Sequence, residues 1–434
     1  MAEQSQQARQ RDQNDKIGFW EAVSIGVGGM VGGGIFAVLG LSVQLARGGT
    51  PVAFAIAGAV ALLTAYSYSK LSVSIPNRGG TVIFLDRAFG KTLCTGSANV
   101  LLWLSYVIML ALYAYAFGSY GSSLLPESFG SAGKHALMSL AIIVPTLLNM
   151  ADARAVAEIE AYVVAVKIAI LTVFLAFGWQ GIDSARLAPA QWVPALPLVA
   201  GGMMIFVAYE GFELIANTAE DIVRPKRTLP LAYFTSVGFV VALYVAIAMV
   251  AVGGLSLQAL LGARDYALAE AARPFFGPAG FTIIVVAALL STFSAINATL
   301  YGSARLSYEI AKEGELPEEL ERKIWGKPLE GLLITAVLAL ALVNVADLSS
   351  ISLLGSAGFL VIFAAVNAAN LKLRKNVRSN GFIAALGMLG CLAAFAAMVW
   401  QTVGENPSQA WVLAGLFGAA VALEGSFRVF HRGN

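Results

Sequence analysis

Charge, histidine and cysteine are all scarce in this chain. Only 12% of its 434 residues are charged and 58% are hydrophobic, against about 25% charged in an ordinary soluble domain. His135 and His431 lie near expected membrane edges or tails, and no HExxH, GxSxG or paired-aspartate pattern occurs. Cys94 and Cys391 match no metal or redox spacing and are expected to be reduced packing residues. The chain is therefore predicted to lie in a membrane, to bind no metal and not to be an enzyme.

Long apolar runs dominate what is present. Blocks of about 18 to 25 residues with almost no internal charge have the length that a helix needs to cross about 30 Å of hydrocarbon. Strand alternation is absent, and backbone polar groups in lipid must be satisfied within each segment, so we predict an all-α fold. About twelve spans are expected, at 17–41, 51–73, 97–125, 136–151, 155–178, 195–218, 231–254, 279–306, 330–346, 350–371, 381–403 and 409–427.

The segments outside these blocks are short. The first 19 residues, MAEQSQQARQRDQNDKIGF, lack the apolar core and cleavage site of a secretory signal, so the first span is expected to be retained as an anchor. A single membrane domain over residues 1–434 is predicted. The longest loops are expected to form short surface or amphipathic helices, at 76–95, 179–194, 255–278 and 307–329.

Basic residues are distributed unequally between the two sides. With the amino terminus in the cytoplasm and sides alternating at each span, 22 of the 28 Lys and Arg residues fall on the cytoplasmic side and 5 outside, while Lys167 lies within a span. By the positive-inside rule, this predicts a multi-pass protein of the cell membrane with both termini cytoplasmic. Orientation explains the basic residues, so no nucleic-acid partner is expected.

Two of the expected spans carry residues that a regular lipid-facing helix tolerates poorly. The span at 195–218 contains GGMMIFVAYEGFE, which places Glu210 and Glu213 at membrane depth. The first span contains GVGGMVGGGIF, and each interior glycine costs a helix about 1 kcal/mol relative to alanine. Both spans are therefore predicted to be interrupted, although close helix packing of the GxxxG kind would also explain the glycines. Those of the first span are Gly26, Gly28, Gly29, Gly32, Gly33 and Gly34.

The spacing of the two interruptions predicts an internal repeat. They fall in spans one and six, which are five spans apart. Because this number is odd, the second half of the chain crosses the membrane in the opposite orientation to the first. Paired breaks in matching spans point to a transporter whose substrate binds between them. Half-helix amino ends present N–H groups to a carboxylate, and unwound carbonyls accept from an ammonium group, which together suit an amino acid.

Three segments carry a family resemblance: GFWEAVSIGVGGMVGGGIF, FVAYEGFELIANTAEDIVRPKRTLPLA and NATLYGSARLSYEIAKEGELP. Over nearly the whole chain they resemble the amino acid, polyamine and organocation (APC) transporter superfamily. The likeness is greatest to sodium-independent, proton-coupled amino acid transporters with a lysine in span five, the position of Lys167. The resemblance implies alternating access and a five-plus-five inverted repeat, 17–178 and 195–371, followed by two additional helices at 381–427.

Lys167 is the predicted proton-coupling residue. It lies roughly 16 to 18 Å from either end of its span, too deep to snorkel, where a charge costs about 2.5 to 3.5 kcal/mol. By resemblance its ammonium group replaces a sodium ion, so no sodium and no cofactor are expected. The resemblance implies as its partners the Gly28 carbonyl and the Ser291 hydroxyl, with Ser294 one turn further. Alternatively, Lys167 is a permanently charged strut held by backbone carbonyls or by Glu210 or Glu213.

Backbone groups at the two breaks are the predicted substrate contacts. Phe206 resembles the aromatic gate of the family but could be ordinary packing, Glu213 is expected to act in gating, and Tyr106 and Ser356 are weaker pocket candidates. Glu210 departs from the apolar residue usual in the motif; it could favour cationic substrates, form a second proton site, or have no contact with substrate. The predicted carboxylate contacts are the N–H groups of Val31, Gly32, Gly33 and Gly34. The predicted ammonium contacts are carbonyls at Gly28, Gly29, Phe206, Val207, Ala208 and Tyr209, beside Glu210 and Gly211.

The sequence thus predicts a secondary active transporter, most simply a proton-coupled amino acid symporter. The alternative is an exchanger of amino acids or amines that favours cationic substrates, because the superfamily contains both symporters and exchangers. The expected partners are a small-molecule substrate and the lipid bilayer, and no obligate protein partner is evident.

Overall fold

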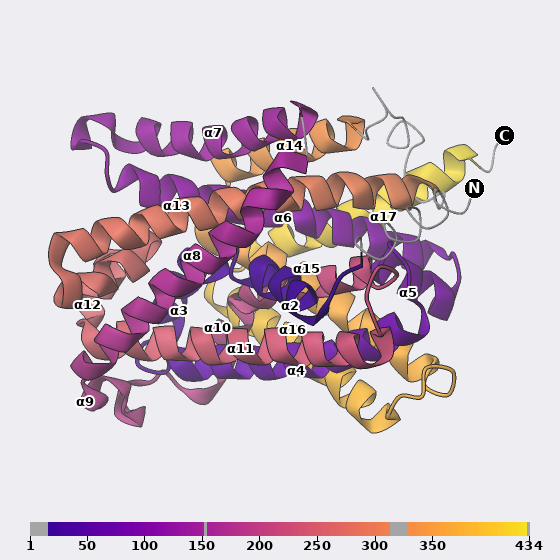
Figure 1. The fold of residues 1–434 in the computed structure, drawn as a ribbon, viewed down its shortest axis with the longest axis horizontal. Coiled ribbons are helices and arrows are strands. Elements are labelled where there is room, and N and C mark those ends of the chain that lie inside the picture. The colour runs from indigo at the N-terminus through magenta and orange to yellow at the C-terminus, as the bar shows by residue number, and fades with distance from the viewer. Residues whose placement is uncertain (1–15, 152–153, 313–328, 432–434) are drawn as a thin grey trace, which may run out of the picture.

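The computed structural model describes residues 16–151, 154–312 and 329–431, and this part of the chain is almost entirely helical (Figure 1). Nine of its helices are long and apolar enough to cross a membrane, or eleven if each of two bent helix pairs counts as one span. The all-α prediction is confirmed. The nine are α4 (Thr50–Ser74), α6 (Leu93–Ser122), α7 (Gly130–Ala151), α8 (Arg154–Gly178), α11 (Pro225–Gly254), α13 (Ala267–Lys312), α15 (Leu348–Lys372), α16 (Gly381–Glu405) and α17 (Ser408–His431).

The two bent pairs are the spans that glycines and buried acids mark in the sequence. Helix α2 (Phe19–Met30) meets α3 (Gly34–Ala46) at an angle of 44°. Helix α10 (Ala195–Met204) is followed, at an angle of 50°, by the 3₁₀ segments η4 (Phe206–Tyr209) and η5 (Phe212–Thr218). The predicted interruptions are therefore confirmed. The expected span at 330–346 is a shorter apolar helix, α14 (Leu329–Val345).

Helix α13 comprises two helices that meet at a kink at Gly277, whose φ is 61°. Pro278 suits the first turn of the second helix, which begins close to the expected 279. The first helix lies within 255–278, where short helices are expected. One detail of the sequence interpretation is wrong. Cys94 is exposed near the start of α6 and is not a packing residue, whereas Cys391 is buried as expected.

The loops mostly contain short helices, as predicted. Most of the 307–329 segment lies outside the described residues. The remaining short helices are η1 (Glu127–Phe129), α5 (Thr81–Phe89), η2 (Trp179–Gly181), α9 (Ser184–Leu187), η3 (Pro189–Gln191), α12 (Leu257–Gly262) and η6 (Arg264–Tyr266).

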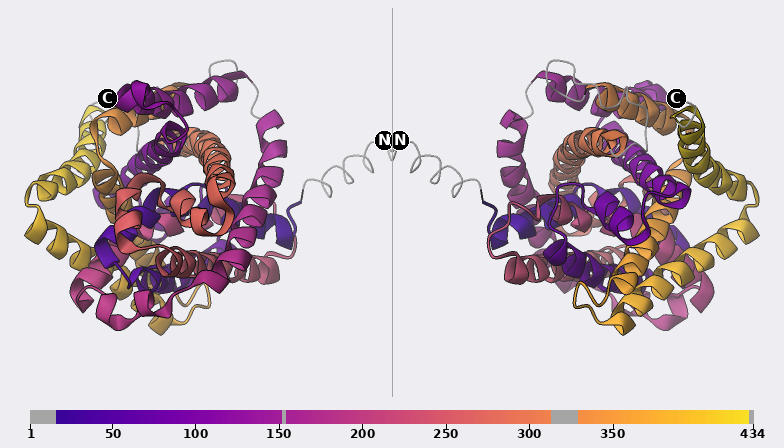
Figure 2. Two further views of the ribbon diagram at one scale, coloured as in Figure 1. Left: turned by 90° about the vertical axis from the view of Figure 1, so that its left-hand side faces the viewer. Right: turned by 90° about the vertical axis from the view of Figure 1, so that its right-hand side faces the viewer.

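The helices form an inner group and an outer group. The apolar windows of α6 and α15 are 83% and 78% buried within the protein, whereas those of α8, α16 and α17 are 28%, 28% and 22% buried. Figure 2 shows α8 on one flank and α17 on the opposite flank, around the inner helices. The outer helices thus present apolar side chains to lipid, and the bent pairs lie within the protein, where irregular backbone is tolerated.

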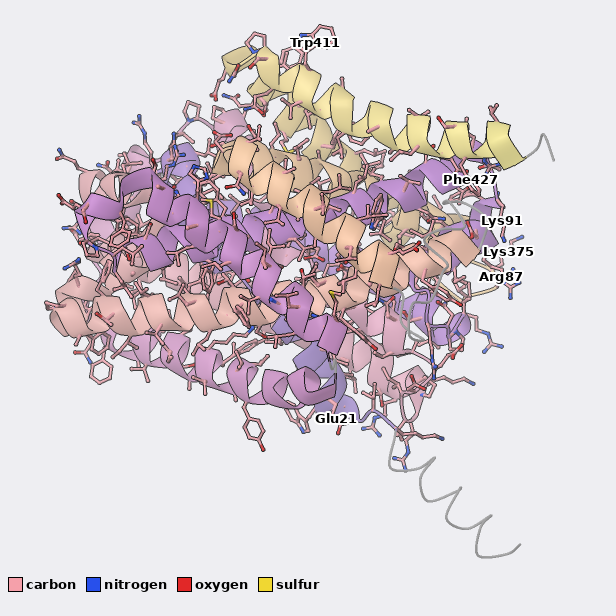
Figure 3. The ribbon with its side chains drawn as sticks, turned by 90° about the horizontal axis from the view of Figure 1, so that it is seen from above. Glu21, Arg87, Lys91, Lys375, Trp411 and Phe427 are labelled. Atoms are coloured by element: carbon pink, nitrogen blue, oxygen red, sulfur yellow. The ribbon has the colours of Figure 1, made fainter. Side chains whose placement is uncertain are left out.

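Basic side chains gather at one end of the molecule. Arg87, Lys91 and Lys375 lie at the same end as Phe427, and Trp411, near the start of α17, lies away from them (Figure 3). These three basic residues come from two separate loops that the alternation of spans assigns to one side. Their common position is the arrangement that alternating spans require.

Candidate functional site

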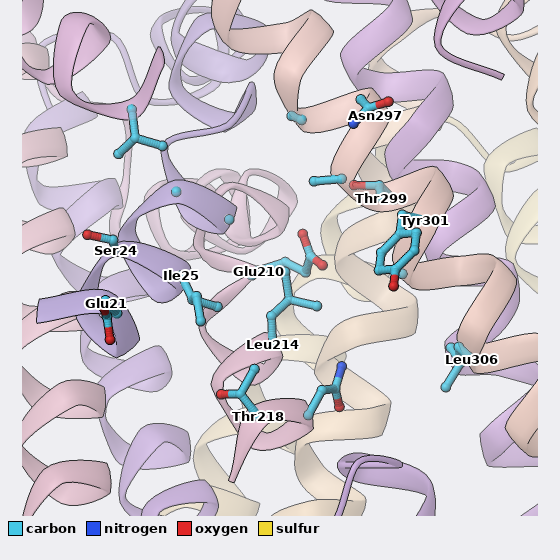
Figure 4. A pocket seen from close by; sticks show the side chains of 18 of the residues that line it. Glu21, Ser24, Ile25, Glu210, Leu214, Thr218, Asn297, Thr299, Tyr301 and Leu306 are labelled. Atoms are coloured by element: carbon cyan, nitrogen blue, oxygen red, sulfur yellow. The ribbon is translucent and has the colours of Figure 1, made fainter. Parts of the chain in front are cut away.

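A cavity of about 750 Å³ leads from the surface to the two broken helices. It extends from Trp20, whose side chain is 74% exposed at the start of α2, to Gly28 and Gly29 at the first break. Figure 4 shows Ser24 and Ile25 of α2 on one side and α13 on the other, with Glu210 between them. A space of this size is typical of a small-molecule site.

The two breaks touch each other backbone to backbone at the deep end of this cavity. Gly211 has a φ of 115°, and a Cβ atom added there would lie 2.5 Å from the carbonyl carbon of Gly29. A Cβ atom added at Gly29 would lie 2.8 Å from the carbonyl oxygen of Gly211. Unwinding and close packing, which were alternative explanations of the glycines, therefore occur together.

Replacing Gly211 tests this contact. Gly211→Ala should lower the thermal unfolding midpoint by about 5 °C or more, because strain at a positive φ alone costs about 1 to 3 kcal/mol and the added methyl group collides with Gly29. The matched control is Gly238→Ala in α11, where a Cβ atom meets nothing within 4 Å and alanine should be neutral or stabilising. Equal melting of both variants in detergent would contradict the contact.

Donors from three other helices satisfy carbonyl groups of the first break. Lys167 Nζ of α8 donates to the Gly28 carbonyl at 3.3 Å, and the Tyr244 hydroxyl of α11 donates to the Met30 carbonyl at 2.6 Å. The Ser291 hydroxyl of α13 donates to the Val31 carbonyl at 2.9 Å and also to that of Gly32. Three helices thus hold the first break in its unwound form.

The N–H groups predicted for a substrate carboxylate do not line the cavity. The N–H groups of Val31 and Gly32 donate to the carbonyls of Val27 and Gly29 within the end of α2. Gly33 and Gly34 are buried, Gly33 against the ring of Tyr113. In the first break, only Gly28 and Gly29 of the predicted contacts reach the cavity.

Lys167 lies behind the cavity wall. It is 1% exposed, and Val164, one turn earlier in α8, lines the cavity next to Gly28. This burial agrees with a lysine too deep to snorkel. Ser294 is half-buried one turn beyond Ser291 and does not line the cavity.

Most of the second break is anchored away from the cavity. The Val207 N–H group donates to the Ser356 hydroxyl at 3.0 Å, and the Tyr209 hydroxyl donates to the Phe54 carbonyl at 2.8 Å. Phe206 is fully buried and packs edge-on against Phe363. Phe206, Val207, Ala208 and Tyr209 thus belong to the core in this conformation. Of the predicted contacts in this break, Glu210 and Gly211 reach the cavity.

Glu210 and Glu213 form a buried carboxyl pair. They are 4% and 2% exposed and lie close enough to interact electrostatically. Tyr113 donates to Glu210 at 3.5 Å, Tyr106 donates to Glu213 at 3.2 Å, and the Gly211 N–H group donates to Glu213 at 2.8 Å. Within the described residues, neither carboxylate forms a salt bridge with Lys167.

The mouth of the cavity is fixed by the turn that leads into α11. Arg78 forms salt bridges with Glu220 and Asp221 at 3.4 and 3.1 Å, and hydrogen bonding to Asp221 raises the pKa of Arg78. Arg224 caps α11 with a φ of 51°, and Pro225 begins that helix. These residues form the structural turn that the sequence motif indicates.

Several polar side chains of the cavity were missed by the sequence analysis. Asn149 of α7 donates to Asn297 of α13 at 2.7 Å, and both line the cavity together with Tyr113. Asn297 begins the segment NATLYGS, which we identified only as a family motif. Asn149 and Tyr113 lie in regular spans, where no local signal distinguishes a cavity-lining side chain from a packed one.

Multiple membrane-spanning helices and two broken helices that meet at a small-molecule cavity define a multi-pass membrane transporter. The chain belongs to the amino acid permease family, whose model matches residues 17–421, and it is therefore a transporter and not an enzyme. It is 37% identical over 383 residues to an uncharacterized protein of Methanocaldococcus jannaschii, covering 86% of this chain and 88% of that one. It is 32% identical over 413 residues to the inner membrane transport protein YbaT of Escherichia coli, covering 93% and 94%.

A substitution in α13 tests how the first break is held. Ser291→Ala should destabilise the protein by about 1 to 3 kcal/mol, because it removes the hydroxyl donor from two carbonyls in a buried, unwound segment. Thr292→Val is the control, since the equally buried Thr292 hydroxyl bonds carbonyls of its own helix. Thermal unfolding in detergent should separate the two, and a control that melts as early as Ser291→Ala would contradict the assignment.

Proposed function

We propose that this permease is a sodium-independent, proton-coupled amino acid symporter that works by alternating access. One observation carries the proposal: the buried amine of Lys167 donates to Gly28, a residue that both lines the cavity and lies in the last turn of the first half-helix. A change in the protonation of this amine would therefore change a hydrogen bond to a residue that lines the proposed substrate site. This supports the sequence prediction of proton coupling and of the APC subgroup with a lysine in span five.

The mechanism follows from the charge of that donor. A protonated amine binds a carbonyl oxygen more strongly than a neutral one, because charge-assisted hydrogen bonds are roughly twice as strong. Protonation of Lys167 would therefore stabilise the observed contact between α8 and the first break, and deprotonation would loosen it. A substrate that favours the same conformation is then linked to the proton by differential stabilisation.

Substrate recognition is proposed at the deep end of the cavity. The ammonium group would contact the carbonyls of Gly28 and Gly29, and the N–H groups of Gly33 and Gly34 would become available to the carboxylate once Tyr113 moves. Phe206 and Glu213 are proposed as gating residues because both lie between the second break and neighbouring helices. A cofactor is not required.

Names of further relatives support a small nitrogen-containing or polar substrate without identifying it. The chain is 28% identical over 330 residues to cationic amino acid transporter 9 of Arabidopsis thaliana, covering 71% of this chain and 57% of that one. It is 25% identical over 400 residues to a methylthioribose transporter of Bacillus subtilis, covering 86% and 84%.

Transport assays with Lys167→Ala test the coupling. In sodium-free proteoliposomes, an inward proton gradient should drive accumulation of a labelled amino acid by the wild type, and the mutant should lose that gradient dependence. Lys70→Ala, at a half-buried lysine of α4, is the control and should keep it. Uptake that ignores the gradient but requires internal amino acid would establish an exchanger and leave Lys167 a strut.

We also propose that the cavity opens to the cytoplasm, with both termini on that side of the cell membrane. The distribution of Lys and Arg supports this orientation, and the cavity mouth at Arg78 belongs to the basic side. In this assignment the structure is inward-facing. The inverted repeats remain assigned to 17–178 and 195–371.

Cysteine labelling tests the orientation in a Cys94→Ser background, which removes the exposed native thiol. A membrane-impermeant maleimide should label Glu127→Cys, at an exposed outer loop, in intact cells. Thr218→Cys, which lines the cavity, should react in inside-out vesicles and be protected by bound substrate. The reverse pattern would overturn the proposed orientation.

A further inference from the structure

We propose that Glu210 makes the cavity selective for substrates with a net positive charge, namely amino acids with a cationic side chain or the corresponding amines. The inference rests on the proposed function for the location of the substrate and adds the substrate class. It concerns a side chain, whereas the contacts described above for the substrate are backbone groups that any amino acid could use.

The charges around the cavity are the first argument. Among the described residues, the charged side chains that line it are Glu21, Arg78 and Glu210. The charge of Arg78 is balanced by its salt bridges to Glu220 and Asp221. The remaining charges that line the cavity are negative, one near the mouth and one at the deep end, and they outnumber the single amine of Lys167 behind the wall at Gly28. A cation is therefore favoured over an anion.

The position of Glu210 is the second argument. Its side chain lies between α2 and α13 and points into the cavity (Figure 4). Two neighbouring buried carboxyl groups repel each other when both are ionised, so the pair with Glu213 can carry one negative charge. Within the described residues, neither carboxylate forms a salt bridge. An ammonium or guanidinium group of a substrate in the cavity would supply the missing positive charge.

The hydrogen-bonding groups near the deep end are the third argument. The N–H groups of Val31, Gly32, Val207 and Gly211 already donate to protein oxygens. The acceptors of the residues that line the cavity there are the carbonyl groups of Gly28 and Gly29, which already accept from Lys167 and from the Gly32 N–H group, and the carboxylate of Glu210. Each carbonyl oxygen has a second lone pair that can accept a further hydrogen bond. Acceptors complement the several N–H donors of a cationic side chain.

A binding experiment that needs no proton gradient tests the proposal. Affinities of the detergent-purified protein for arginine and citrulline, which differ by one cationic group, are measured by calorimetry for the wild type, Glu210→Gln and Glu127→Gln. The wild type should prefer arginine by about tenfold or more, as expected for an added charge pair in a shielded site. Glu210→Gln should reduce the preference to about threefold or less, and the control Glu127→Gln, at an exposed glutamate that does not line the cavity, should keep it.

Agmatine, the amine that corresponds to arginine without its carboxylate, distinguishes cationic amino acids from amines as the substrate class. If it binds as well as arginine, the site takes amines; if its affinity falls by more than about tenfold, the site requires an α-carboxylate and takes cationic amino acids. Should Glu210→Gln fail to fold, Glu210→Asp keeps the charge and should keep the preference for arginine. A wild type that does not prefer arginine over citrulline, or a Glu210→Gln variant with an unchanged preference, would overturn the proposal. Either result would leave proton coupling through Lys167 intact, because that is measured separately by gradient-driven uptake.

Discussion

The close approach of two unwound backbones is the constraint on which the rest of this structure depends. Gly29 and Gly211 meet with no side chain between them, and each break leaves peptide groups that its half-helices cannot pair. At membrane depth such groups must be satisfied by other protein groups or by water in a cavity. Neighbouring helices therefore supply partners, and the cavity ends where the two breaks meet.

The two breaks are satisfied in different ways, and this difference shapes the site. Side-chain donors reach the carbonyls of the first break from outside it, as Tyr244 does for Met30. In the second break, N–H groups are also hydrogen-bonded: that of Val207 donates to Ser356 and that of Gly211 donates to Glu213. The cavity is left facing acceptors in preference to donors. Its polarity is thus a consequence of how the irregular backbone is held in place.

The breaks could be located from the sequence because glycines and carboxylates are energetically unfavourable within a membrane-spanning helix. Interior glycines weaken a helix, and Glu210 and Glu213 could not face lipid, so both breaks were predictable before any packing was known. Which peptide groups face the cavity was not predictable, since that depends on how the half-helices are rotated against each other. For this reason Gly28 and Gly29 line the cavity while Gly33 and Gly34 do not.

The fold was predictable to a similar degree and for similar reasons. Apolar length identifies a helix that meets lipid along its whole span, such as α16. It does not identify where α13 begins, because residues 267–277 form a helix that carries charges outside the apolar core of the span. Cavity residues such as Tyr113 and Asn149 escaped notice because their helices are regular, and only the assembled bundle turns them toward the site.

The lysine at the first break is the residue on which the proposal of proton coupling, as opposed to simple exchange, depends. A hydroxyl group satisfies Met30, and another satisfies Val31, at far lower cost than a charge. An amine within a span costs about 2.5 to 3.5 kcal/mol when it is protonated, and in the described part of the chain neither Glu210 nor Glu213 offsets that cost by a salt bridge. An exchanger needs no titratable donor at this point, because its substrate alone must stabilise the moving helices. Among the described side-chain donors to this break, Lys167 alone can carry a positive charge, and the proposal of proton coupling rests on that difference.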